Sequence, residues 1–236
     1  MALSKLRESG SVWVLAPRVR RQLVGKVCSR LREQYGTPRL GNPTDPVDDL
    51  VYIMLSNKTR PEMAAAVFGR LHETYGTWER LADDELASLE ALLAPSGLSR
   101  VRARQMQSAL KKLIADFGDC SMDRLRGGAD EEVVGYLVTL PGVSEKVAKC
   151  VMMYTMDREV LPVDSHVYRI GCRLGWTTRK RADQSGAELE ALVPSADRYA
   201  FHVDCVEHGR KFCRPKNPHC SACCVRQFCR YALESE

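Results

Sequence analysis

Apolar residues recur at a helical spacing along most of this chain, and this pattern constrains its fold more than any other feature. In residues 18–35 they recur every four positions and end at Gly36, as in an amphipathic helix with a glycine stop. No convincing pair of alternating strands occurs. The pattern predicts an all-α protein of about ten helices. The other expected helical segments are 46–56, 60–75, 130–139, 145–155, 165–174, 182–193 and 196–209.

Start signals accompany several of the helical patterns. Pro61 stands in a first-turn position, where its missing N–H costs nothing. Asp83 and Asp84 can cap a helix that carries four leucines between positions 86 and 93. Ser99 can cap another that carries apolar residues from position 101 to 117.

The composition is that of an ordinary globular protein of one or two domains. The chain has 236 residues, of which 44% are hydrophobic and 28% are charged, enough for a real core. No apolar run reaches the roughly 18–20 residues of a membrane helix, and no secretory signal is visible. We therefore expect a chain that stays inside a cell, in the bacterial cytoplasm or in the nucleus or mitochondrion of a eukaryote. Its ten cysteines are then more probable as metal ligands or reactive thiols than as disulfides.

Positive charge is unevenly distributed. The net charge is +5, and residues 1–40 hold nine basic side chains against two acidic ones. A second basic run without acids covers 99–112, whereas 79–90 is acidic. A sided distribution fits a surface that attracts nucleic acid, although each run can also be a solvated helix face. Residues 1–17 lack the helical spacing and are expected to form a basic extension.

Four cysteines near the end of the chain form the pattern C-x6-C-x2-C-x5-C, at Cys213, Cys220, Cys223 and Cys229. Four thiolates so close in sequence can surround one metal centre, either zinc or an iron–sulfur cluster. Because zinc sites more often consist of two C-x2-C pairs, the spacing favours iron–sulfur. Cys224 directly follows a ligand and should point elsewhere. The remaining cysteines are interpreted as small core residues: Cys28, Cys120, Cys150, Cys172 and Cys205.

Basic residues surround this box. Pro215 and Pro218 stiffen the loop between its first two cysteines. Such a loop can present Arg214 and Lys216 to a phosphate backbone. The metal centre would then act as a structural cross-link.

A second strong signal is the segment LPGVSEKVA at 140–148. A helix ends, a turn containing Gly142 follows, and a new helix begins with Ser144 as its cap. Backbone N–H groups at a helix start can hold a phosphate without reading sequence. A plain helix–turn–helix connection without a ligand explains this segment equally well. A second such turn, LPVDSHV at 161–167, places Asp164 at a helix start.

Together these motifs resemble the endonuclease III family of helix–hairpin–helix DNA glycosylases. The order is LPGVSEK, then VDSH with Asp164 eighteen residues after Lys146, then the cysteine box after HGR. The resemblance implies two helical domains with a DNA cleft between them. One is a six-helix barrel over 41–157, which contains the hairpin. The other combines 18–40 with 158–236 and holds a 4Fe-4S cluster.

The resemblance also implies catalytic roles for Lys146 and Asp164. In such chemistry the damaged base leaves the stack, a carboxylate stabilises positive charge on the sugar, and a neutral lysine attacks the sugar carbon. The start of a helix disfavours a protonated lysine. The alternatives are a phosphate-binding surface lysine and a plain helix cap. His166 can contact phosphate or Asp164, or can simply be packed.

Four further positions bear on how DNA is held. Lys58 stands where the family usually carries a glutamine that reaches into the space of the flipped base. Ser144 replaces a usual glycine, and Glu145 places a negative charge where a basic residue is frequent. Leu98 matches the family's wedge residue, which fills the stack, but is also explained as an ordinary core leucine.

The expected function is that of a monomeric DNA glycosylase and abasic-site lyase that removes oxidised pyrimidines from duplex DNA. The mismatch-adenine glycosylases resemble this chain in hairpin and cluster but generally lack the lysine. A sibling enzyme for mispaired thymine or uracil stays open. A weakly active or non-catalytic paralogue that binds damaged DNA stays open as well. The unusual residues Lys58 and Glu145 suggest this alternative. A redox protein is a more distant possibility.

Overall fold

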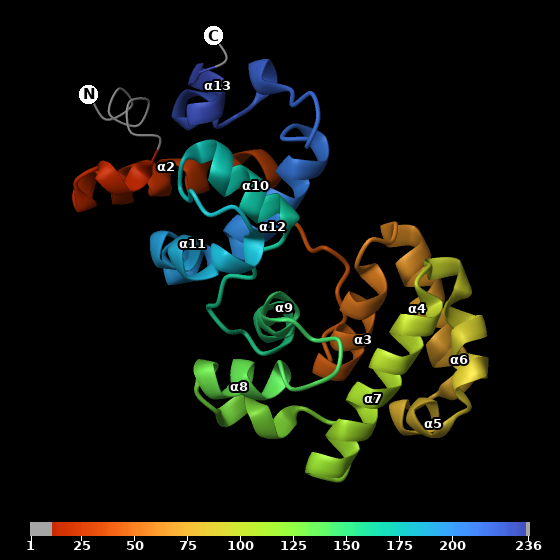
Figure 1. Ribbon diagram of the computed structural model, residues 1–236. Helices are drawn as coiled ribbons and strands as arrows, with labels where there is room; N and C mark the ends of the chain where they lie inside the picture. The colour runs from red at the N-terminus through yellow and green to blue at the C-terminus, as the bar shows by residue number, and fades with distance from the viewer. Residues whose placement is uncertain (1–10, 235–236) are drawn as a thin grey trace. The chain divides into compact units, whose positions relative to one another are not determined.

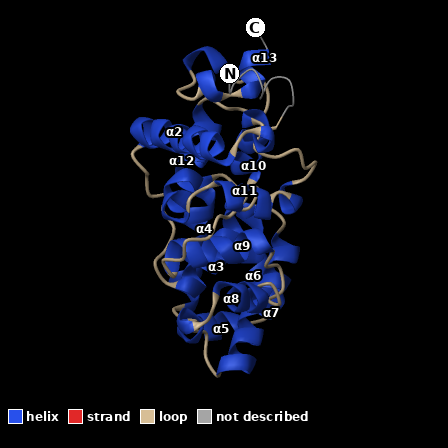
Figure 2. Cartoon of the chain, turned by 90° about the vertical axis from the view of Figure 1, so that its left-hand side faces the viewer, coloured by secondary structure: helices blue, strands red, loops and turns tan. Residues whose placement is uncertain are grey.

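The computed structural model describes residues 11–234, and all of their regular structure is helical (Figures 1 and 2). No strand occurs in this part of the chain. The prediction of an all-α protein is therefore confirmed. No helix in the same residues is long and apolar enough to cross a membrane.

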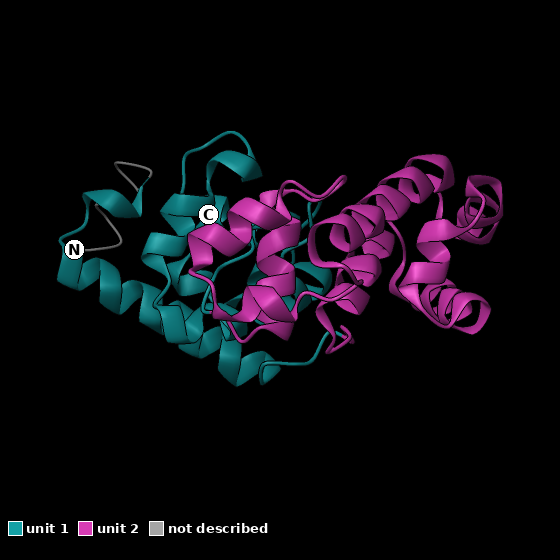
Figure 3. Cartoon of the chain, turned by 90° about the horizontal axis from the view of Figure 1, so that it is seen from below, with its two compact units in different colours: residues 1–40, 159–236 teal, residues 41–158 magenta. Residues whose placement is uncertain are grey.

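The chain divides into two compact units (Figure 3). Unit 2 is continuous, from Gly41 to Arg158, and unit 1 combines the segments before and after it. The helices of unit 2 are α3 (Pro46–Ser56), α4 (Pro61–Tyr75), α5 (Trp78–Asp83), α6 (Leu86–Leu93), α7 (Ser99–Phe117), α8 (Asp130–Leu137) and α9 (Glu145–Thr155), with 3-10 turns η2 (Ala94–Ser96) and η3 (Asp123–Gly127). Those of unit 1 are α2 (Pro17–Tyr35), α10 (Ser165–Leu174), α11 (Gly186–Leu192), α12 (Arg198–Lys211) and α13 (Arg230–Glu234), with η1 (Val12–Val14), η4 (Ala182–Gln184), η5 (Ser195–Asp197), η6 (Cys220–Ala222) and η7 (Arg226–Phe228).

In unit 2, α3 is the central element. It packs against α4 and α9, while α7 packs against α5 and α6. The almost wholly apolar sequence of α3 explains its position, because Val47, Leu50 and Leu55 are each at most 1% exposed. The helix α9, which begins within the LPGVSEK motif, is therefore held against the most buried helix of its unit.

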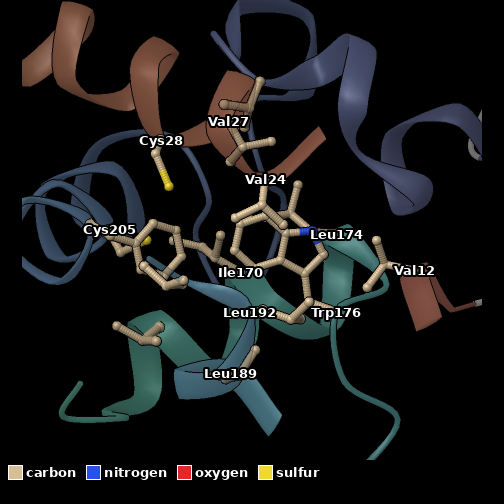
Figure 4. Packing of buried hydrophobic residues seen from close by; sticks show 14 of the residues in the cluster. Val12, Val24, Val27, Cys28, Ile170, Leu174, Trp176, Leu189, Leu192 and Cys205 are labelled. Carbon is tan, nitrogen blue, oxygen red and sulfur yellow. The ribbon is translucent and has the colours of Figure 1, made fainter. Parts of the chain in front are cut away.

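The core of unit 1 forms around Trp176 (Figure 4). Its indole stacks on Phe201 of α12 at 5.4 Å between ring centroids and lies among apolar side chains of α2 and α10, including Val24 and Ile170. Cys28 and Cys205 are buried in this same cluster. Their interpretation as small core residues is therefore confirmed, and Cys150 is buried in unit 2. Cys120 and Cys172 are only half-buried.

Local signals explain where several helices begin. Asp45 caps α3, accepting from the N–H groups of Val47 and Asp48 at 2.8 and 3.0 Å. Pro17, Pro46 and Pro61 each occupy the first position of their helix. Each of these residues matches what a helix start favours, a side-chain acceptor or a residue without an N–H.

Two predicted caps are wrong. Asp83 belongs to the end of α5, a short helix that the apolar pattern does not reveal, and α6 begins after Glu85 without a side-chain cap. Ser99 is the first residue inside α7, and the residue before it is Leu98 in a left-handed conformation, again without a side-chain cap. Both helices begin without a side-chain cap, so a nearby polar residue is a misleading signal for their start.

The segment before α2 is only partly described. Residues 1–10 of the predicted basic extension lie outside the described residues. Val12 is fully buried and its N–H donates to the carbonyl of Gly175 at 2.7 Å. The indole N–H of Trp13 donates to the carbonyl of Trp176 at 3.0 Å. Residues 11–16 are thus part of the fold of unit 1, because their apolar side chains complete its core.

Candidate active site

The hairpin between α8 and α9 is tight because Gly142 allows a close approach. Its φ is +84°, and a Cβ at this position would lie 2.9 Å from the Cβ of Gln105 on α7. Both the left-handed backbone and the lack of space exclude a larger residue. The N–H of Val143 donates to the carbonyl of Leu140 at 3.0 Å and closes the turn.

Ser144 caps α9, as predicted. Its hydroxyl accepts from the N–H of Val147 at 3.4 Å, and its φ is −89°. The replacement of a glycine by serine therefore causes no backbone strain here. Glu145 binds Lys149 one turn further along, with 2.9 Å between Oε1 and Nζ. This ion pair partly neutralises the negative charge that the sequence placed near the expected phosphates.

Lys146 is half-buried in the first turn of α9, next to the central helix of unit 2. A buried carboxylate, Asp49 on α3, acts electrostatically on it. Asp49 is fully buried, and burial raises its pKa to about 7. Asn42 donates to its Oδ1 at 2.6 Å, while Oδ2 has no partner in the described residues. The neighbourhood of Lys146 thus contains an acid that is only about half ionised near neutral pH.

Asp164 in unit 1 caps α10, as predicted. Its Oδ1 accepts from the N–H groups of His166 and Val167 at 2.9 and 2.8 Å. Asp164 is half-buried, and no hydrogen bond to its Oδ2 occurs in the described part of the chain. One oxygen is therefore committed to the helix start, which fixes the side chain, while the other is available to a ligand.

His166 is half-buried beside Arg169. Its Nδ1 lies 3.2 Å from Nη2 of Arg169, and burial lowers its pKa. Arg169 also donates to the carbonyl of Gly209 on α12 at 3.2 Å. A Cβ at Gly209 would lie only 2.2 Å from the His166 ring nitrogen. His166 thus lies between Arg169 of its own helix and Gly209 of α12. Its contact with phosphate or with Asp164 stays a prediction.

Lys58 and Leu98 occupy two loops of unit 2, and both are in the left-handed region. Their φ angles are +58° and +53°, a conformation that costs a residue with a side chain roughly 1–2 kcal/mol. Both are exposed, Leu98 to 61%. The interpretation of Leu98 as an ordinary core leucine is therefore wrong. Strained, exposed residues of this kind concentrate at functional sites.

The four cysteines of the box line one hollow of unit 1. The hollow is partly open to solvent, and its wall includes Cys213, Cys220, Cys223 and Cys229. Cys224 is absent from this wall and packs against the core. Within residues 11–234, no three His, Cys, Asp or Glu side chains converge closely enough to hold a single metal ion.

Basic side chains of the surrounding helices contact the box. Arg173 of α10 lies 3.1 Å from the Cys213 sulfur and also donates to the carbonyls of Arg214 and Pro215 at 2.8 and 3.1 Å. His208 of α12 lies 3.4 Å from the Cys223 sulfur. The side chains of Arg214 and Lys216 are exposed on the loop. N–H groups directed at sulfur are typical surroundings of thiolate ligands.

Comparison with known proteins assigns the family. Residues 51–195, more than half of the chain, match the family model described as HhH-GPD superfamily base excision DNA repair protein. The chain belongs to the HhH-GPD superfamily. Endonuclease III of Thermotoga maritima is 32% identical over 194 residues, which cover 82% of this chain and 87% of that protein. Endonuclease III of a Synechocystis strain is 30% identical over 191 residues, covering 80% and 83%. The resemblance to the endonuclease III family is thus confirmed.

Solved structures of Endonuclease III with DNA share the fold of this chain. A non-covalent Endonuclease III–DNA complex aligns at a TM-score of 0.79 and 24% identity, covering 91% of this chain and 97% of that one. A trapped covalent Endonuclease III–DNA intermediate aligns at a TM-score of 0.80, also with 24% identity.

Sequence reasoning missed three residues of this HhH-GPD protein that shape the site. Arg102 belongs to the basic run 99–112 that the sequence suggests is a surface, yet its side chain is buried between two loops. The helical pattern of the sequence assigns no particular role to Asp49 or Gly209. For Asp49 a signal existed, namely an acid within a nearly apolar helix. For Arg102 and Gly209 the deciding contacts are made with residues of other elements, so no local pattern reveals them.

Proposed function

We propose that this protein is a bifunctional DNA glycosylase and abasic-site lyase that removes oxidised pyrimidines from duplex DNA. The observation that carries the proposal is Lys146 in the first turn of α9, directly after the hairpin, in a chain of the HhH-GPD superfamily. A lysine at this position supplies the amine that a lyase requires, because a Schiff base with the opened sugar needs a primary amine.

The hairpin binds one phosphate of the DNA backbone. Gly142 lets the backbone of the turn lie close against Gln105 of α7, and Ser144 caps the first turn of α9. Such N–H groups hold a phosphate regardless of sequence. Arg214 and Lys216 add charge-dependent contacts that position the duplex.

Lys146 is the nucleophile of the reaction. Its neutral amine attacks the sugar carbon that bears the damaged base, and the base leaves with the electron pair of the glycosidic bond. Loss of a proton and opening of the sugar give a Schiff base, and β-elimination then breaks the strand on the 3′ side. Two features favour the neutral amine: the positive end of the α9 dipole and the partly buried position of Lys146.

Asp164 stabilises the positive charge that develops on the sugar. Its Oδ1 is held by two N–H groups, so the carboxylate is oriented before substrate binds and needs no reorganisation in the transition state. Capping and catalysis thus use different oxygens of one side chain.

The cysteine box fits a 4Fe-4S cluster held by Cys213, Cys220, Cys223 and Cys229. Four thiols around one hollow, with Arg173 and His208 directed at two of the sulfurs, are the donor set that such a cluster takes. When bound, the cluster supplies structural cross-linking of the loop, with no redox step in the base-excision chemistry. The loop then presents Arg214 and Lys216 as a rigid pair. Residues 18–40 and 158–236 form the cluster domain in this proposal, and 41–157 the barrel domain.

Borohydride trapping tests the proposal. The wild-type protein is expected to form a covalent adduct with duplexes that contain thymine glycol or an abasic site, and Lys146→Ala is expected to form none, a loss of at least a thousandfold. Lys111→Ala is the control, since Lys111 is an exposed lysine on α7 of the same unit. An adduct that persists in Lys146→Ala contradicts the assignment of the nucleophile.

A panel of lesions separates the remaining possibilities. Cleavage of thymine glycol duplexes above all others supports the oxidised-pyrimidine substrate, whereas preference for mispaired thymine or uracil identifies the sibling activity. Tight binding to abasic DNA without cleavage in a single turnover identifies a non-catalytic damage-binding protein. Sedimentation of the protein–DNA complex checks the expected single copy per duplex.

A further inference from the structure

The two loops that carry Lys58 and Leu98 are joined by hydrogen bonds. One loop follows α3 and the other follows η2. The hydroxyl of Thr59 in the first loop donates to the carbonyl of Ser96 in the second at 3.0 Å. Ser96 is itself buried, and its hydroxyl donates to the carbonyl of Leu93 at 2.8 Å. Neither loop can therefore move far without disturbing the other.

Arg102 of α7 strengthens this junction from within. Its Nη1 donates to the Ser96 carbonyl at 2.7 Å, and its Nη2 donates to the carbonyl of Asn57. The guanidinium thus spans both loops. Its two acceptors are the carbonyls of Asn57, next to Lys58, and of Ser96, two residues before Leu98. A planar fork with fixed N–H directions is suited to hold two carbonyls at a set separation.

The charge of Arg102 is held without a carboxylate. The side chain is 4% exposed, burial lowers its pKa, and no acidic group of residues 11–234 forms an ion pair with it. The two carbonyls belong to the ends of α3 and η2, where unpaired carbonyls and the negative end of a helix dipole favour a cation. A buried charge retained under these conditions indicates a positional task, since an apolar residue would fill the space at lower cost.

Each loop exposes a side chain shortly after the held carbonyl, Lys58 one residue after Asn57 and Leu98 two residues after Ser96. Lys58 and Leu98 are in the left-handed region, and Leu98 presents a large apolar surface to solvent. An exposed apolar side chain beside a cationic one suits a distorted duplex, in which the apolar group fills a gap in the stack and the cation contacts phosphate or a base edge.

We propose that Arg102 is a positioning residue that fixes Lys58 and Leu98 as one rigid pair for engaging DNA at the damaged nucleotide. This inference rests on the proposed function. It assigns recognition of the distortion to the joined loops, and to Arg102 the task of keeping their separation constant.

Binding measurements with three variants test the inference. The probes are a duplex with a tetrahydrofuran abasic analogue and the same duplex undamaged. Arg102→Met is expected to weaken binding of the abasic duplex by at least tenfold and of the undamaged duplex by less than twofold. Arg102→Lys should restore part of the loss, because one of the two carbonyls is still reached. Arg104→Met, an exposed arginine of the same helix, should weaken both duplexes by equal factors.

A double-mutant cycle shows whether Arg102 acts through the loop. In a Leu98→Ala background, Arg102→Met should cost less than threefold, because the side chain that it positions is already missing. Thr59→Val removes the second link between the loops and should weaken binding of the abasic duplex less than Arg102→Met does. This variant replaces the arginine variants in the test if they do not fold. Fully additive losses, or equal losses on both duplexes, overturn the inference.

The two proposals fail differently. If wild-type protein does not form the borohydride adduct but discriminates abasic from undamaged DNA and shows the coupling, the proposed chemistry is wrong and the role of Arg102 stands. If the adduct forms and the coupling is absent, the reverse holds. Absence of any discrimination between the duplexes overturns the role of Arg102.

Discussion

At the scale of single residues, several side chains serve the fold and the proposed chemistry at once. Ser144 and Asp164 start helices, and the same contacts orient the groups that would meet DNA. Such caps are visible in a sequence because the interaction spans only two or three residues. Asp49 is different, since its properties arise from the helices packed around it.

Asp49 predicts an unusual dependence of stability on pH. Its pKa in the folded protein is about 7, against 3.8 as the ordinary value. The folded state therefore binds the extra proton between about pH 4 and pH 7, and stability falls as the pH rises through this range. Asp49→Asn imitates the neutral acid and removes this loss. We expect the variant to match wild type near pH 4 and to exceed it above pH 7 by up to about 4 kcal/mol.

Urea unfolding at a series of pH values measures this difference. Asp204 also has a pKa raised by burial, to about 6, but it is present in both proteins and cancels. Asp83→Asn, at an exposed position of the same unit, should leave the pH profile unchanged. Parallel profiles for wild type and Asp49→Asn would show that Asp49 is ionised in the fold.

At the scale of elements, the decisive contacts are those at which two helices approach closely. α10 and α12 pack against each other in unit 1, and Gly209 leaves room for the His166 ring and for Arg169 between them. Arg169 in turn donates to the carbonyl of Cys213 at 2.8 Å. The helix started by Asp164 is thus connected to the first cysteine of the box through two arginines, Arg169 and Arg173.

Gly209→Ala is expected to destabilise the protein. A Cβ would lie 2.2 Å from the His166 ring nitrogen and 2.7 Å from Arg169, so one of these side chains must leave its position, at a cost of roughly 1–3 kcal/mol. Gly135→Ala is the control, because the added Cβ on α8 meets nothing within 4 Å. There the change should stabilise by roughly 0.5–1 kcal/mol through helix propensity. Thermal unfolding of both variants checks the two signs; equal shifts contradict the packing argument.

At the scale of the whole molecule, the protein consists of two units with separate cores. The tryptophans distinguish them, since Trp13 and Trp176 belong to unit 1 and Trp78 to unit 2. In the proposal, the cysteine box is a cross-link of unit 1 alone.

Loss of the cluster should therefore destabilise one unit selectively. In Cys220→Ser, unit 1 is expected to unfold at least 10 °C lower than in wild type, roughly the effect of 2 kcal/mol or more on a domain of this size. Fluorescence of the Trp78→Phe background follows unit 1, and calorimetry follows both units. Cys224→Ser, outside the lined hollow, should change little. A uniform shift of both transitions would contradict a cluster that stabilises unit 1 only.

The helical class, most helix positions, the caps at Ser144 and Asp164 and the family can all be inferred from the sequence, because they depend on spacing within one segment. The cysteine box can be inferred for the same reason. Only the packing of distant segments shows that Leu98 is exposed and strained, that Arg102 is buried between two loops, that burial raises the pKa of Asp49 and that Gly209 admits His166. Each of these depends on which distant residues meet, and a local pattern contains no information on that.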